Sequence, residues 1–515
     1  MVGFVTMMDT DRLLESGTLA AYLVVLLWIG IRSSRKVKTS LDYTLAGRGV
    51  PWAIVMATAA ATMIGGGASV GMVSRVYEVG IAAAFITCAW HLQLIFTGWF
   101  VAPRLRGMNL ITVGDYFHVK LGPIARELAV VNCVIFLVGA LAAQMAAIGT
   151  VANNVLGVRY EVALLIGAAV TVFYSTVGGM RAVITTDVLQ FVILVVGIGA
   201  AAATLVVQQG GFTEMLQQTD PEHFHLTGNW SGIEVISLFF AFLLGETFVP
   251  PYAVRCFVAQ DAAQARAGVA GAGIFLLFFL PVATFALGTS ARIQPEVRQA
   301  IQQETDRNLD EAARLGRQMS EEEAAGKARQ IAFPALVRAT LPPIFAGIVV
   351  AAIIAAVMSS ADSCLSCLAT VVMEDYYRRH INPQASDRGL LRIAQGTTLI
   401  AGSGAAVWAL FQSNVAELLV FIYDFWAPTM VLPFLVALFW YRPARIPAVV
   451  LSMIAGTIAT VTWRFGLDSP WDIGPALFGF AVAVVTFFVS LPLSGLWPTG
   501  PLLQPSVETE PDKTP

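Results

Sequence analysis

The stretch ATMIGGGAS, residues 61–69, places three consecutive glycines, Gly65, Gly66 and Gly67, near the middle of an apolar segment long enough to cross a membrane. Backbone polar groups cannot stay unpaired in lipid, so a membrane helix is interrupted only where it lines a cavity. Glycine leaves the helix more readily than other residues, and its missing side chain lets ions and ligands reach the backbone. We therefore expect a broken helix here.

A second interruption is expected in GETFVPPY, residues 245–252, where Glu246 is followed by Pro250 and Pro251. Proline removes an amide donor and clashes with a continuing helix. This segment lies five apolar segments after the first break. Breaks at corresponding positions of two halves indicate the binding site of a secondary transporter. The alternative is that the small residues simply permit close helix packing.

The composition around these breaks excludes a soluble globular protein. Residues AVILMFWYC make up 57% of the chain and charged residues 13%, against about 45–50% and 25% in soluble proteins. Mean hydropathy is +0.72. We expect an all-α polytopic protein with the lipid bilayer as its main surroundings. The net charge of −3 gives no reason to expect nucleic acid as a partner, and five cysteines in apolar stretches fit reduced thiols. No phosphate-binding loop, zinc-protease motif or nucleophile elbow is present, so we expect neither an enzyme nor a cofactor.

Runs of about 20 apolar residues predict thirteen transmembrane helices. They are placed at 17–34, 50–72, 80–103, 127–153, 160–178, 182–207, 233–252, 264–289, 343–373, 390–412, 415–440, 446–465 and 474–497. With the N-terminus outside, the inside loops hold 18 Lys and Arg residues, Arg255 among them, and the short outside loops only Arg75, Arg159 and Arg464. Positive charge favours the cytoplasmic side, so the tail 498–515 is expected in the cytoplasm. The outside loop 290–332, with seven basic and eight acidic residues, is expected to form amphipathic helices over the membrane face, as a connector or as a gating lid.

The ninth predicted span carries AAVMSSADSC, residues 355–364. Ala356, Ser359, Ser360 and Ser363 follow one another at helical spacing and share a face, with Asp362 at its border. Hydroxyl and carbonyl oxygens suit hard cations, and an ionised carboxylate in the membrane marks a functional site by default. Serines that bond to their own helix are the alternative, which accounts for the serines but not for Asp362.

The sixth span begins within GGMRAVITTDVLQF, residues 178–191, and Asp187 lies about a turn inside the membrane. It could close a second cation site, relay protons, or pair with a nearby arginine. Further polar and aromatic groups within the predicted spans are candidates to bind a substrate. They are His91, Gln93, Gln144, Glu246, Tyr252, Asp424 and Trp426, together with the three glycines. Aromatic rings beside carboxylates would suit an amine or quaternary ammonium, and an interhelical hydrogen-bond network is the alternative.

The motifs GGMRAVITTDVLQF and AAVMSSADSCLSCLATVVMEDYYRR, the latter at residues 355–379, resemble those of the sodium/solute symporter family. The resemblance covers roughly residues 15–465 and implies the LeuT-type fold, an inverted repeat of five plus five helices. One extra helix would precede the repeats and two would follow. The implied divisions are 1–48 for the extra helix and its loop, 49–207 and 208–441 for the two repeats, 442–497 for the last two helices, and 498–515 for a disordered tail.

The same resemblance implies a sodium site made of the carbonyls of Ala61, Ile64 and Ala356 and the hydroxyls of Ser359 and Ser360. A second site in some members would map to Asp187 and Ser363. The neighbouring serine of those members is Asp362 here, which leaves sodium and protons as alternatives for that site.

Among family members, ATMIGGG and MSSADS are most similar to the high-affinity choline carriers, although the positions matching the tryptophans of their choline cage are Met63 and Val249. The expected function is sodium-coupled import of a small organic solute across the plasma or inner membrane by alternating access. A proton-coupled carrier using the intramembrane carboxylates is the alternative within transport. A membrane solute sensor acting with a partner chain is the alternative from another class.

Overall fold

The computed structural model describes residues 2–156, 158–228, 230–245, 248–314, 318–411, 415–467, 469–470, 473–492 and 494. Within these ranges the chain is helical, and no strand is formed beyond an isolated bridge between Val50 and Ala259. The predicted all-α class is therefore confirmed. Glu246 and the tail 498–515 lie outside the described residues.

The helices of the first half are α1 Val2–Ser34, α2 Ser40–Leu45, α3 Trp52–Met63, α4 Met72–Val79, α5 Ile81–Phe96, α6 Ala102–Gly107, α7 Val113–Leu121, α8 Pro123–Leu156, α9 Tyr160–Gln208, α10 Phe212–Gln217 and α11 Gly232–Gly245. Those of the second half are α12 Pro250–Val258, α13 Ala262–Ile293, α14 Pro295–Arg314, α15 Glu321–Ala328, α16 Ala332–Thr340, α17 Pro343–Thr370, α18 Asp387–Phe411, α19 Val415–Trp426, α20 Leu432–Phe439, α21 Ile446–Val461 and α22 Pro475–Ser490.

The predicted number of thirteen spans is not confirmed by helix length and composition. Among the described residues, nine helices are long and apolar enough to cross a membrane, or ten if one bent pair counts as a span. Two further apolar helices, Gly232–Leu244 and Pro475–Ser490, are shorter. Each predicted span nevertheless coincides with helical residues, so the difference in number comes from short helices and from a merged pair.

The merged pair is α9, whose 49 residues cover the fifth and sixth predicted spans. A straight helix of that length would extend about 74 Å, far beyond the ~30 Å hydrocarbon core. Gly179 interrupts it with φ 51° and ψ −149°. A Cβ atom at Gly179 would lie 2.6 Å from the carbonyl oxygen of Tyr43, so only glycine permits this close approach between α9 and α2.

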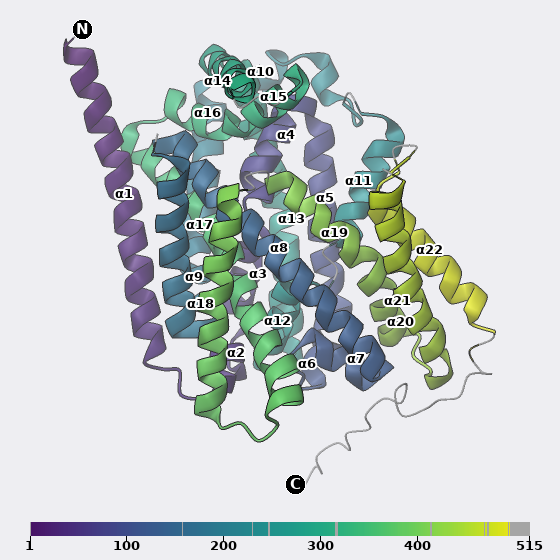
Figure 1. The fold of residues 1–515 in the computed structure, drawn as a ribbon. Coiled ribbons are helices and arrows are strands. Elements are labelled where there is room, and N and C mark those ends of the chain that lie inside the picture. Colours follow the sequence, from purple (N-terminus) through teal and green to yellow (C-terminus); the bar gives the residue numbers. More distant parts are fainter. Residues whose placement is uncertain are drawn as a thin grey trace.

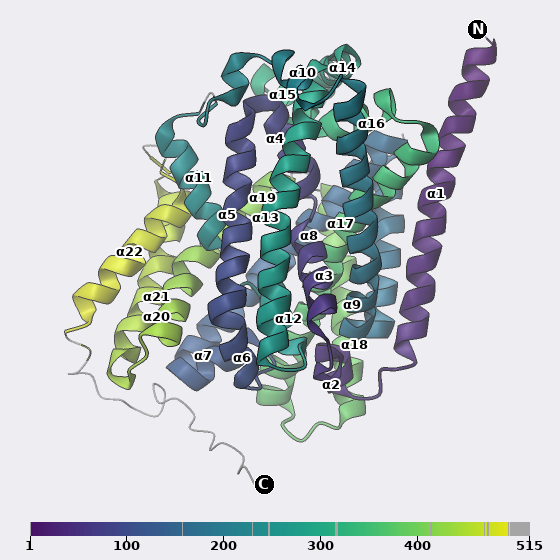
Figure 2. The same cartoon turned by 180° about the vertical axis from the view of Figure 1, so that it is seen from behind.

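Helix α17 lies at the centre of the bundle, packed against α9, α8, α1 and α3, and its residues from Val349 to Val371 are almost all buried. Figures 1 and 2 show the long helices side by side, with α14, α15 and α16 lying together across one end of the bundle. We call these three the cap helices. They pack on one another, and an ion pair from Arg329 to Glu78 joins the segment between α15 and α16 to the end of α4.

Candidate functional site: a broken helix beside a buried oxygen cluster

The second predicted span is broken where the glycines predict it. Helix α3 ends at Met63, Ile64 caps it, and the segment Gly67–Val79 continues at a bend of 62°. A π-helical turn, Gly67–Gly71, starts the second half. A Cβ atom at Gly65 would lie 2.7 Å from the Ser360 hydroxyl oxygen. The break thus brings the α3 backbone against the serines of α17.

Oxygen atoms from α3 and α17 meet beside this break. The Ser359 hydroxyl donates a hydrogen bond to the carbonyl of Ala61 at 2.9 Å and lies 2.9 Å from the carbonyl of Ala356. The Ser360 hydroxyl donates to the carbonyl of Thr62 at 2.9 Å and lies 3.4 Å from Ala356. We call these five oxygens the α3–α17 oxygen cluster. All five residues are buried.

The chemistry of the cluster favours an alkali or other hard cation. It consists of neutral hydroxyl and carbonyl oxygens, which suit hard ions, whereas softer metals prefer histidine and cysteine. No group of three or more His, Cys, Asp or Glu residues with metal-binding geometry occurs in the part of the chain that the structure describes. Ile64, the remaining residue that the resemblance implies as a ligand, is fully buried at the end of α3.

Asp187 is paired with a buried arginine. Nη2 of Arg255, on α12, lies 2.8 Å from Oδ2 of Asp187 and 2.6 Å from Oγ of Ser363. The hydroxyl of Thr58, on α3, also donates to the Asp187 carboxylate. The sequence prediction placed Arg255 in a cytoplasmic loop, and this was wrong. Because α12 begins directly at Pro250, Arg255 falls on a buried turn and is fully inaccessible to solvent.

Asp362 belongs to the same buried network. Its Oδ2 accepts a hydrogen bond from the Tyr174 hydroxyl at 2.6 Å, and its Oδ1 lies 3.3 Å from the Ser363 hydroxyl. That hydroxyl also lies 2.7 Å from the carbonyl of Ser359. The two acidic groups are thus joined to the α3–α17 oxygen cluster through one side chain, Ser363.

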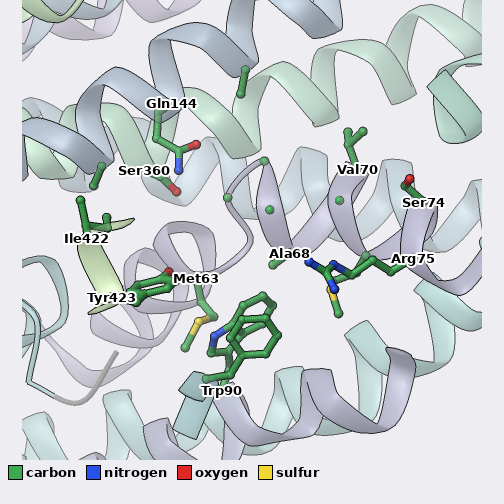
Figure 3. A pocket seen from close by; sticks show the side chains of 18 of the residues that line it. Met63, Ala68, Val70, Ser74, Arg75, Trp90, Gln144, Ser360, Ile422 and Tyr423 are labelled. Atoms are coloured by element: carbon green, nitrogen blue, oxygen red, sulfur yellow. The ribbon is translucent and has the colours of Figure 1, made fainter. Parts of the chain in front are cut away.

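On the other side of the break lies a cavity of about 410 Å³. Its wall combines the glycine segment with apolar and aromatic side chains, chiefly Met63, Phe136, Phe242 and Tyr423. Gly326 and Gln330, from the segment around the cap helices, close part of it. Figure 3 shows that Gln144 and Ser360 approach it from one side and Trp90 and Arg75 from the other.

Half of the predicted substrate residues line this cavity. Gly65, Gly66, Gly67, Gln144 and Tyr252 all face it, together with Ser360 of the oxygen cluster. The amide oxygen of Gln144 is buried and has no hydrogen-bond partner within the described ranges, so a solute could donate a hydrogen bond to it.

Of the other predicted substrate residues, Glu246 lies outside the described residues, and His91, Gln93, Trp426 and Asp424 are not among those that line the cavity. Both ring nitrogens of His91 are buried without a partner among the described residues. Gln93 donates to Thr97 at 2.7 Å. Trp426 packs against Phe136, with ring centroids 5.0 Å apart. Asp424 pairs with Arg464 and accepts a hydrogen bond from the backbone of Ala476 at 3.2 Å.

The sequence analysis did not predict two of the residues that line the cavity. Arg75 was counted as an outside-loop charge, but it lies on α4 and lines the cavity half-buried. Trp90, on α5, presents a buried indole nitrogen that has no partner in the part of the chain that the structure describes. A signal for Arg75 was present, because helical spacing after the glycines puts it two turns into the second half of the broken span.

A bent helix crossing an apolar bundle, an oxygen cluster at the bend and a cavity beside it define a membrane carrier. Comparisons with known proteins identify the family of carriers to which the chain belongs. The model of the Sodium:solute symporter family matches residues 43–456, and the chain belongs to this family. Its members are transporters rather than enzymes, and sodium is the coupling ion that fits them.

Individual transporters are similar to the chain over most of its length. The chain is 26% identical to a sodium/glucose cotransporter of Vibrio parahaemolyticus, covering 87% of this chain and 84% of that protein. It is 24% identical to the sodium/proline symporter of Escherichia coli, covering 91% and 92%. It is 25% identical to a high-affinity choline transporter of Caenorhabditis elegans, covering 76% and 68%. The solved structure of a Na⁺-coupled sialic acid symporter in an outward-open state has the same fold, with a TM-score of 0.78 at 20% identity over 93% of this chain and 97% of the other.

Proposed function

We propose that the protein imports one small organic solute together with sodium by alternating access, and that sodium binds at the α3–α17 oxygen cluster with Ile64 as a further carbonyl ligand. The observation that carries this proposal is the position of the Ser359 and Ser360 hydroxyls, each 2.9 Å from a carbonyl oxygen at the end of α3. Here the hydroxyl protons bridge the two helices. A bound cation would instead accept lone pairs from the same oxygens and hold the helices together.

The coupling between sodium and solute passes through the glycine segment. Gly65 lines the cavity together with Ser360 and Gln144, and the position of its missing Cβ is 2.7 Å from Oγ of Ser360 and 3.5 Å from Nε2 of Gln144. An ion that sets the spacing of α3 and α17 therefore sets the wall against which the solute packs. Coupling of this kind is reciprocal, so each ligand must tighten the binding of the other by the same factor.

For the group around Asp187, we propose an internal ion pair instead of a second sodium. The guanidinium of Arg255 lies between Asp187 and Ser363, where a second cation would need to bind. Asp362 is engaged by Tyr174. A protein that carries its own cation at this position needs one transported sodium per cycle. Proton coupling through Asp187 and Asp362 remains the competing possibility and is separated from this proposal by experiment.

We further propose that the cap helices face the outside, with the N-terminus outside and the C-terminus in the cytoplasm, as the distribution of Lys and Arg favours. Large apolar side chains exposed on peripheral helices, such as Trp28, Phe278 and Ile400, support a surrounding bilayer.

The test uses the purified chain in liposomes loaded with potassium. Radiolabelled proline, lactate, glucose and choline are offered with an inward sodium gradient, with potassium in place of sodium, and with an inward proton gradient alone. We expect one of these solutes to accumulate only with the sodium gradient, and Ser359→Ala to shift its sodium dependence upward. Uptake that persists without sodium and follows the proton gradient would contradict the proposal.

A further inference from the structure

The cavity beside the broken helix carries a positive charge that no group of the described chain neutralises. Among the described residues, the charged side chains that line it are those of Arg75 and Glu78. The Glu78 carboxylate is paired with Arg329, outside the cavity wall. In the part of the chain that the structure describes, the Arg75 guanidinium makes no ion pair or hydrogen bond, and its polar contact is with the ring face of Trp230, 5.9 Å away.

Two uncharged polar atoms in the same wall also have no hydrogen-bond partner among the residues that the structure describes. The indole Nε1 of Trp90 is a donor, and the amide Oε1 of Gln144 is an acceptor. Their side chains are at least nine-tenths buried, with exposed fractions of 6% and 7%. Buried polar atoms are nearly always hydrogen-bonded, so atoms left free around a cavity indicate the groups that a ligand supplies. In Figure 3 the Arg75 side chain reaches toward Ala68, and the ring of Trp90 lies at another part of the wall, near Met63.

Two intramembrane carboxylates of the described chain are engaged elsewhere. Asp187 is paired with Arg255, Asp362 accepts a hydrogen bond from Tyr174, and neither lines the cavity. An amine or quaternary ammonium would bind beside the cationic Arg75. For a sugar, the described part of the wall offers two uncharged polar side chains buried without partners, and the rest of it is largely apolar and aromatic. A carboxylate matches the planar fork of an arginine, which binds it through two parallel hydrogen bonds.

We propose, on the basis of the symport function above, that the transported solute is a small carboxylic acid with an apolar body and a neighbouring N–H or O–H group. Arg75 and the indole N–H of Trp90 bind the carboxylate, and Oε1 of Gln144 accepts from the N–H or O–H group. The aromatic wall packs on the body of the solute. A cavity of about 410 Å³ lies at the small end of the ~300–1,000 Å³ range of ligand pockets.

The test measures thermal stabilisation of the purified full chain in sodium and in potassium. The compounds are proline and lactate, their methyl esters, glucose and choline. We expect proline or lactate to raise the melting temperature in sodium and its methyl ester to have no effect. Arg75→Gln should raise the half-saturating concentration of the acid by about tenfold or more. Arg75→Lys should recover part of the lost affinity. The matched control is Arg307→Gln, which removes an exposed arginine from α14.

The outcomes separate this proposal from the symport function. Sodium-dependent stabilisation by choline, glucose or an ester keeps the function and overturns the carboxylate. An acid that binds Arg75→Gln as tightly as the wild type also overturns it, as does the absence of an effect from both acids. A wild-type protein that responds to a solute equally in potassium and sodium instead contradicts the proposed symport.

Discussion

Replacing Gly65 with alanine tests the contact between the glycine segment and the oxygen cluster. The added Cβ atom would lie 2.7 Å from Oγ of Ser360, which is closer than real Cβ atoms approach another atom. It would lie 3.4 Å from Cβ of Ser360, an ordinary contact. The Ser360 hydroxyl must therefore move away from the sodium position. Hydrogen bonds and ligand contacts to charged groups contribute about 1.5–3 kcal/mol, so losing one ligand should raise the half-saturating sodium concentration roughly 10- to 150-fold.

The assay is displacement of bound ²²Na⁺ from purified protein by unlabelled sodium. Gly71→Ala is the matched control, because this glycine also lines the cavity but its nearest foreign atom would be 3.7 Å from a new Cβ. The double variant Gly65→Ala/Ser360→Ala should bind sodium no more weakly than Ser360→Ala alone, because both changes remove the same ligand. An unchanged sodium affinity in Gly65→Ala, or strictly additive losses in the double variant, would refute the reasoning.

Three further changes probe the buried polar groups. Ser359→Ala should raise the sodium requirement for uptake, because its hydroxyl contacts a carbonyl on each side of the cluster; unchanged sodium dependence would remove this residue from the site. Arg255→Gln should lower the free energy of unfolding by about 3–5 kcal/mol, since it leaves Asp187 buried without its partner. Adding Asp187→Asn should recover part of the lost melting temperature, measured in potassium. Additive losses from the two substitutions would argue against the ion pair. Asp424→Asn breaks the pair with Arg464 and should lower stability while leaving ²²Na⁺ affinity within about twofold of wild type; a larger loss would place Asp424 in the sodium site.

The sequence predicts the break of the second span because three adjacent glycines at mid-span, paired with two prolines five spans later, favour interrupted helices over close helix packing. The structure bends the chain by 62° at that point. The common helix face of Ala356, Ser359, Ser360 and Ser363 can also be predicted from the sequence, because helical spacing alone places these four residues on one face. Whether these oxygens bind sodium stays a prediction.

Contacts between distant segments were beyond sequence reasoning. The sequence around Arg255 predicts a loop residue, because nothing in it indicates that α12 is a short helix buried among its neighbours. Its partner, Asp187, lies 68 residues earlier in the chain, and only packing brings the two together. Arg75 was missed for a related reason. Counting basic residues for orientation treats each as exposed to solvent, whereas this one is half-buried in the cavity wall.

The span count shows a third kind of limit. Hydropathy separates the two segments around Gly179, while the structure carries helical residues through both sides of it. The helices at 232–244 and 475–490 are shorter than a full span. The rest of the first predicted segment, 250–252, belongs to α12, which begins at the prolines expected to interrupt that span, and the second helix ends at Ser490, before the predicted end at 497.

The central claim is tested most directly by ²²Na⁺ binding to the purified wild-type protein and to Ser359→Ala. The account predicts one saturable site per chain in the wild type, displaced by unlabelled sodium but not by potassium, and a marked loss of affinity in Ser359→Ala. Absence of saturable binding, or equal affinity in both proteins, would contradict a sodium site between α3 and α17.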